Sequence, residues 1–122
     1  MNERRTFSRV PFVADAMLVF AGGQLPAELL DLSLAGALVA CADAAAPGRG
    51  EAVTLVLALG DNALVLEMGA RVAHREGDHF GLAFERVELE TMVHLRRLLE
   101  LNLGDAERIK REVFELIRPA TD

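Results

Sequence analysis

The feature that most constrains the fold is a series of short apolar stretches that alternate residue by residue between turn residues. From Val53 to Leu59, every odd-numbered position is Val or Leu, and from Phe12 to Phe20 every even-numbered position is Phe, Ala or Leu. A period of two places the apolar residues on one face of a β-strand. Pairs such as Gly22-Gly23 and Gly77-Asp78 separate the stretches and are typical of tight turns. The sequence therefore predicts a mainly β fold.

This pattern continues from Phe12 to Phe84 and predicts six strands. The expected strands are Phe12–Phe20, Leu25–Leu32, Ala37–Ala42, Val53–Leu59, Ala63–His74 and Phe80–Phe84. Within the fifth, Gly69 allows a bulge or a bend. Short strands at this spacing favour a small six-stranded antiparallel barrel.

The periodicity changes after Val87, where apolar residues recur at helical spacing. The stripe of the first helix consists of Leu89, Met92, Leu95, Leu99 and Leu103. Asp105 can cap a second helix, which has its own stripe of Ile109, Val113, Leu116 and Ile117 and ends before Pro119. We expect the two helices to pack together; the alternative is that the second forms a homodimer or holds a partner protein.

Length and composition set further limits. A chain of 122 residues is expected to form one domain, with an arm at 1–11, the barrel at 12–87 and helices at 88–118. A single cysteine, Cys41, excludes an internal disulfide and a cysteine-based zinc cluster and fits a reducing cytoplasm. No apolar stretch reaches the roughly 18 residues of a membrane span, so we expect no membrane insertion.

Charge is unevenly distributed along the chain. The first nine residues carry a net charge of +2, from one glutamate and the arginines Arg4, Arg5 and Arg9, within a total of −6. An acidic body argues against binding to DNA or RNA, because nucleic-acid-binding domains are usually basic. A small basic arm on an acidic body suggests a small anionic ligand. On composition alone, a solvated terminus explains the arginines as well.

Two short motifs carry the chemistry. The first is the Arg-x-x-x-Arg of Arg5 and Arg9, and the second is the Asp-x-Ser-x-x-Gly of Asp31, Ser33 and Gly36. Guanidinium groups bind phosphate oxygens and the N7/O6 edge of guanine, and a carboxylate can accept from guanine N1–H and its amine. Together the motifs describe a site for a guanine nucleotide. Alternatively, Asp31 and Ser33 form an ordinary turn and Gly36 supplies a positive φ.

The two motifs, in this order and at this distance, resemble those of PilZ domains, receptors for the bacterial second messenger cyclic di-GMP. The resemblance covers about Arg4 to Leu103 and extends to the segment Gly69–His74 that leads into Phe80–Phe84. It implies a six-stranded barrel closed by a C-terminal helix, with cyclic di-GMP as the ligand and no other cofactor.

The resemblance also implies roles for single residues. Arg5 and Arg9 would wrap around the ligand, while Asp31, Ser33 and Gly36 form a platform on the barrel. Arg4 could bind a second, stacked copy of the dinucleotide. His74 stands where many relatives carry an aromatic residue, often Trp, that can stack on a base; the alternative is an exposed strand residue.

We expect a receptor that signals through a partner protein, with an arm that is mobile until the ligand orders it, because nothing nearby neutralises or buries it. The main alternative is a PilZ-like adaptor that binds no nucleotide; a small RNA- or DNA-binding barrel is a third. An enzyme is not expected, because Ser33 does not lie in a Gly-x-Ser-x-Gly elbow and the histidines lack metal-ligand spacing.

Overall fold

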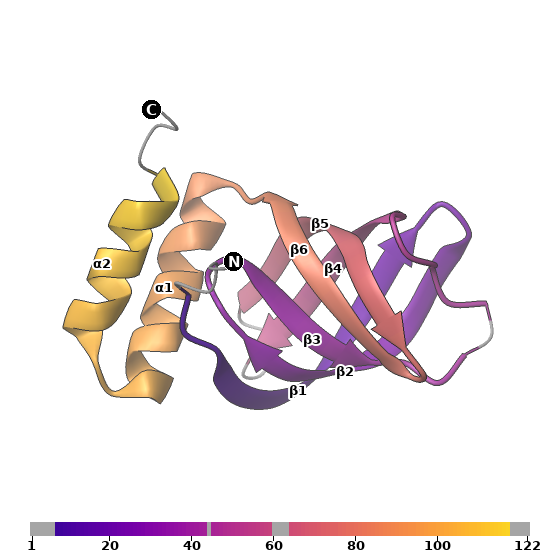
Figure 1. Ribbon diagram of the computed structural model, residues 1–122, viewed down its shortest axis with the longest axis horizontal. Coiled ribbons are helices and arrows are strands. Elements are labelled where there is room, and N and C mark those ends of the chain that lie inside the picture. Colours follow the sequence, from indigo (N-terminus) through magenta and orange to yellow (C-terminus); the bar gives the residue numbers. More distant parts are fainter. Residues whose placement is uncertain (1–6, 44, 60–63, 118–122) are drawn as a thin grey trace.

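The computed structural model describes residues 7–43, 45–59 and 64–117, which form a closed six-stranded barrel followed by two helices (Figure 1). The strands are β1 (Val10–Phe20), β2 (Gly23–Leu32), β3 (Gly36–Ala40), β4 (Ala52–Leu59), β5 (Leu64–Glu76) and β6 (His79–Arg86). Neighbours pair antiparallel in the order β1-β2-β3-β6-β5-β4, and β4 pairs with β1 to close the barrel. The predicted six-stranded antiparallel barrel is confirmed.

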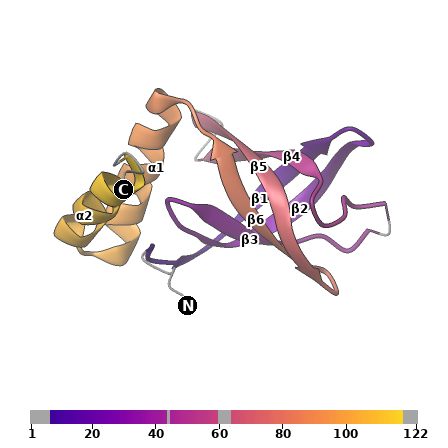
Figure 2. The ribbon, with the colours of Figure 1, turned by 45° about the horizontal axis from the view of Figure 1, so that its top comes forward.

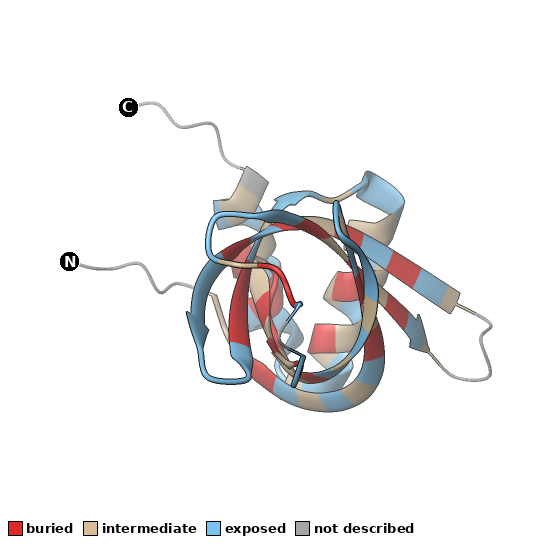
Figure 3. Cartoon of the chain, turned by 90° about the vertical axis from the view of Figure 1, so that its right-hand side faces the viewer, coloured by how far each residue is buried: buried red, intermediate tan, exposed pale blue. Residues whose placement is uncertain are grey.

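The core is formed by side chains from alternate positions of the strands. Leu18 of β1 lies opposite Leu55 of β4, and both side chains are fully buried. Figure 3, which looks along the barrel, shows buried and exposed residues alternating along the strands, with the helices behind the far end. Phe80 of β6 is also fully buried, so a core without Trp or Tyr is filled mainly by aliphatic side chains and phenylalanine.

The strand boundaries differ slightly from those expected. β1 begins at Val10, two residues before the expected Phe12, and β3 ends at Ala40 rather than Ala42. One further backbone hydrogen bond, from the Cys41 N–H to the carbonyl of Asp78, continues the register in which Ala40 faces His79, and β3 ends at this point because β6 begins only at His79. The bulge predicted at Gly69 is confirmed, because the β5–β6 register shifts between that residue and the next.

The two helices form a hairpin at one end of the barrel. Helix α1 (Leu89–Leu103) contacts β1 and β5, and α2 (Ala106–Ile117) packs on its outer side (Figures 1 and 2). The Asp105 carboxylate accepts from the Arg108 N–H at 3.0 Å, so the predicted cap is confirmed. None of the helices among the described residues has the length and apolar character needed to cross a membrane.

The apolar stripe of α1 is only partly as expected. Leu95 and Leu99 are buried against the barrel, but Leu89 is 80% exposed. Six helical residues separate Leu89 from Leu95, which turns their side chains about 120° apart. Leu89 therefore faces away from the barrel, and the predicted apolar stripe is buried only in part.

Candidate functional site

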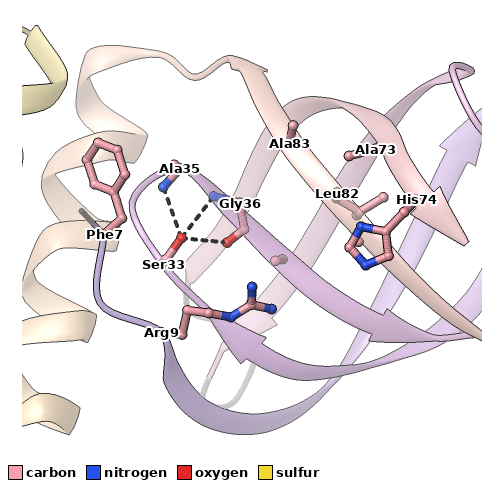
Figure 4. A pocket seen from close by; sticks show the side chains of 11 residues that line it. Phe7, Arg9, Ser33, Ala35, Gly36, Ala73, His74, Leu82 and Ala83 are labelled. Atoms are coloured by element: carbon pink, nitrogen blue, oxygen red, sulfur yellow. Dashed lines mark hydrogen bonds between the residues drawn. The ribbon is translucent and has the colours of Figure 1, made fainter. Parts of the chain in front are cut away.

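An open pocket of about 250 Å³ lies on the outer surface of the barrel, where the chain enters β1. Figure 4 shows its walls: the arm on one side, the β2–β3 turn in the middle, and β5 and β6 on the other side. Its lining residues are Phe7, Arg9, Ser33, Ala35, Gly36, Ala37, Ala73, His74, Gly81, Leu82 and Ala83. Four of the predicted site residues thus meet at one pocket.

The β2–β3 turn is closed by the hydroxyl of Ser33. The Ser33 Oγ accepts from the N–H groups of Ala35 and Gly36, each at 3.1 Å, and donates to the Gly36 carbonyl at 3.3 Å (Figure 4). A serine hydroxyl has one donor and two acceptor positions, so this geometry occupies all three. Ser33 is 7% exposed. Its hydroxyl shapes the turn from within.

Gly36 is required by the close approach of two strands. A Cβ on Gly36 would lie 2.2 Å from the Leu82 carbonyl oxygen of β6, a backbone atom of the neighbouring strand. Its φ is not among the positive values, which occur at Gly23, Gly50 and Gly77 and at the C-cap of α1. The alternative explanation, that Gly36 supplies a positive φ, is therefore wrong.

Arg9 and Asp31 form an ion pair at the edge of the pocket. The Arg9 Nη2 lies 3.0 Å from one carboxylate oxygen of Asp31 and 3.3 Å from the other. The pair arises from strand register, because Val10 is opposite Leu32 and Pro11 opposite Asp31. Their side chains remain 56% and 22% exposed, so both groups are accessible to a ligand.

His74 lies flat on Gly81. The two residues are cross-strand partners on β5 and β6, and a Cβ on Gly81 would meet three atoms of the imidazole ring within 2.5 Å. The ring thus occupies the space that only a glycine leaves empty. His74 faces the pocket across from Arg9 (Figure 4).

The part of the arm that the structure describes is held in place. Phe7 packs against the core cluster, and the Ser8 N–H and hydroxyl both donate to the Glu112 carboxylate of α2, at 2.9 and 2.6 Å. With Arg9 paired to Asp31, the expectation that nothing nearby neutralises or buries the arm is wrong for residues 7–9. Arg4 and Arg5 lie outside the described residues.

Of the predicted residues, Arg9, Ser33, Gly36 and His74 line the pocket, and Asp31 joins them through its ion pair with Arg9. Sequence reasoning missed Ser8, Gly81 and Glu112. Glu112 carried a usable signal: it lies three residues after Ile109 and four before Leu116, on the apolar stripe of its helix. A carboxylate on a buried stripe needs hydrogen-bond partners.

The pKa shifts of titratable groups outside the pocket have local causes. Burial, reinforced by Asp43, raises the pKa of the Cys41 thiol, which donates to the Pro26 carbonyl at 3.5 Å. The hydrogen bond between Arg71 and Glu85 lowers the pKa of Glu85 and raises that of Arg71. Among the described residues, no group of three or more His, Cys, Asp or Glu side chains could hold a metal ion.

A closed six-stranded antiparallel barrel, with a serine-closed turn beside a surface pocket and two helices at one end, defines a small β-barrel domain. The PilZ domain family model matches residues 3–101. The chain therefore belongs to the PilZ domain family.

Solved structures support the same fold. The PilZ domain of YcgR from Escherichia coli with cyclic di-GMP aligns with a TM-score of 0.66 at 18% identity, over 93% of this chain and 96% of that one. The PilZ domain of CeSA from a cellulose-synthesizing bacterium gives 0.61 at 20% identity, over 80% and 96%. The inhibitor of motility MotI/DgrA of Bacillus subtilis gives 0.67 at 18% identity, over 85% of this chain and 53% of that chain. At these identities the likeness is one of fold.

Proposed function

We propose that this protein is a receptor for cyclic di-GMP that acts in a bacterial cytoplasm and signals through a partner protein. The observation that carries the proposal is the meeting of Arg9, Asp31 and His74 around one pocket, since a guanine nucleotide needs a cation, a carboxylate and a flat surface. A neighbour whose structure holds cyclic di-GMP, the PilZ domain of YcgR, supports the choice of ligand.

Each group has a proposed role. The Arg9 guanidinium binds a guanine edge or a phosphate, and Arg5 provides the second arginine of the motif. The Asp31 carboxylate accepts from guanine N1–H and the exocyclic amine. His74 offers its ring for stacking on a base. Arg4 favours a second, intercalated copy of the dinucleotide because it adds another positive charge.

Ser33 and Gly36 contribute through shape. The Ser33 hydroxyl is already used inside the turn, so we assign its role to holding the backbone of the platform. Gly36 allows β3 to approach β6 closely. The platform then presents its backbone to the ligand without rearranging.

The proposed switch is an exchange of partners by the arm. Without ligand, Arg9 is neutralised by Asp31; cyclic di-GMP supplies phosphate charge and a guanine edge that compete for both groups. The arginines of the arm are thereby drawn around the ligand, and arm and ligand together form a new surface that a partner protein reads. Such a domain acts by binding and needs no catalytic group.

Isothermal titration of cyclic di-GMP into the wild type and into Arg9→Ala tests the proposal, with GTP as the control ligand. We expect selective binding of cyclic di-GMP by the wild type and its loss in the variant. The stoichiometry gives one or two ligands per chain. Absence of binding by the wild type would overturn the receptor proposal and favour an adaptor that binds no nucleotide.

A further inference from the structure

We propose that helix α2 is part of the ligand-binding apparatus, with Glu112 as a positioning residue that holds the arm so that Arg9 stands at the pocket. The inference rests on the proposed function and adds to it a residue outside both sequence motifs. Its basis is the contact between Ser8 and Glu112, two residues separated by 104 positions in the chain.

Glu112 is a buried carboxylate that accepts its hydrogen bonds from the arm. Glu112 is 6% exposed, and Ser8 donates two hydrogen bonds to its carboxylate, at 2.9 Å from the backbone N–H and 2.6 Å from the hydroxyl. On its own helix, the Arg108 Nε lies 3.7 Å away, beyond hydrogen-bonding distance. A buried charge that loses such partners is strongly destabilised, so the carboxylate holds the arm firmly.

Fixing Ser8 also orients Arg9. The two residues lie next to each other just before β1 begins at Val10, and their side chains bind different parts of the molecule. With Ser8 turned towards α2, Arg9 is directed to the other side, where it pairs with Asp31 and lines the pocket. The carboxylate of α2 therefore sets the position of the ligand-binding guanidinium through one intervening residue.

The consequence for binding is preorganisation. When the arm is already held by α2, ligand binding has less conformational entropy to remove, and affinity is higher than for a loose arm. Coupling of this kind is reciprocal. If Glu112 helps the ligand to bind, the bound ligand must in turn stabilise α2, although the helix contributes no residue to the pocket lining.

The test is a double-mutant cycle of Ser8→Ala and Glu112→Gln, read by isothermal titration of cyclic di-GMP. Glu107→Gln is the matched control, since it makes the same change on the same helix at an exposed position. We expect about tenfold weaker binding for Glu112→Gln, and a further loss on adding Ser8→Ala that is smaller than its loss in the wild type. The control should bind as the wild type does.

Hydrogen exchange of the intact wild type supplies a readout that does not depend on a variant folding. Saturating cyclic di-GMP should slow exchange of the amides of α2, and Ser8→Ala should reduce that protection. Unchanged exchange in α2, or additive and negligible effects of both substitutions on affinity, would overturn the inference while the receptor proposal stands. If the wild type does not bind cyclic di-GMP at all, the receptor proposal fails and this inference fails with it.

Discussion

The two halves of the candidate site are held by different kinds of contact. Ser33 is buried, and its hydroxyl closes the turn to Gly36 through hydrogen bonds within the turn, whereas Arg9 is held to Asp31 by an ion pair whose arginine side chain is 56% exposed. Buried, fully satisfied turns are rigid, while exposed ion pairs contribute little stability and exchange readily. The comparison indicates a fixed platform that receives the ligand and an Arg9 side chain whose ion-pair partner can be replaced.

The largest effect should come from breaking the platform. Gly36→Ala places a Cβ against the Leu82 carbonyl oxygen, so β3 and β6 must separate locally. We expect the free energy of unfolding to fall by about 1–3 kcal/mol and ligand binding to weaken with it. Urea denaturation measures the change.

Gly48→Ala is the matched control, because a Cβ there would have no atom within 4 Å and the residue does not require a positive φ. Its unfolding midpoint should stay at the wild-type value. Equal midpoints for both variants would contradict the view that the platform is rigid.

Removing the Arg9 side chain should weaken ligand binding strongly while changing the stability of the fold only slightly. In Arg9→Ala the barrel loses only an exposed ion pair, so its stability should change by about 0.5 kcal/mol or less. Affinity for cyclic di-GMP should fall about tenfold to a hundredfold, because charge-assisted hydrogen bonds to the ligand are lost. Denaturation and titration of the same preparation check both. A large loss of stability would show that the arm is a structural element of the barrel.

A smaller loss of affinity is expected when the His74 ring, which faces Arg9 across the pocket, is displaced. In Gly81→Ala the new methyl group displaces the His74 imidazole from its place on β6, and the stacking surface moves away from the pocket. Affinity should fall about threefold to tenfold, the range of a single aromatic contact. The NMR signals of the His74 ring should shift before any ligand is added. An unchanged ring signal and unchanged affinity would exclude His74 from the site.

The smallest effect concerns the exposed arginine-carboxylate pair of Arg71 and Glu85, away from the pocket. Because the folded pKa of Glu85 lies below its usual value, the pair stabilises the fold above the unfolded pKa of this carboxyl. That contribution is lost as the pH falls through the folded pKa. Unfolding midpoints between about pH 6 and about pH 3 should therefore fall less steeply in Glu85→Gln than in the wild type.

The Glu85→Gln variant also compares the effects of the Arg71–Glu85 and Arg9–Asp31 ion pairs on ligand affinity. Glu85→Gln should bind cyclic di-GMP as the wild type does, whereas Arg9→Ala should not. Weaker binding by Glu85→Gln would mean that the ligand surface extends across β5 and β6 beyond the pocket described.

Much of the fold followed from local patterns. Alternation in segments such as Val53 to Leu59 specifies a strand and its buried face, and Gly69 marked the bulge correctly. The boundaries of β1 and β3 could not be predicted, because they depend on where neighbouring elements end.

The residues of the site could be predicted from the sequence, but the hydrogen-bond partners of those residues could not. The motif containing Asp31 and Ser33 located the platform, yet the sequence does not encode whether a serine hydroxyl binds a ligand or closes its own turn. The contact of Ser8 with Glu112 joins the two ends of the chain. It depends on how α2 packs, which no local pattern specifies.

The most direct test of the account is an NMR titration with cyclic di-GMP that follows the Arg9 Nε–H and the amides of Ala35 and Gly36. The account predicts that the Arg9 signal moves strongly as the guanidinium leaves Asp31 for the ligand. The two amides should shift but stay protected from exchange, because Ser33 still holds them. No change in the Arg9 signal at saturating ligand, or loss of protection at both amides, would contradict the account, in which Arg9 exchanges Asp31 for the ligand while the Ser33 turn stays closed.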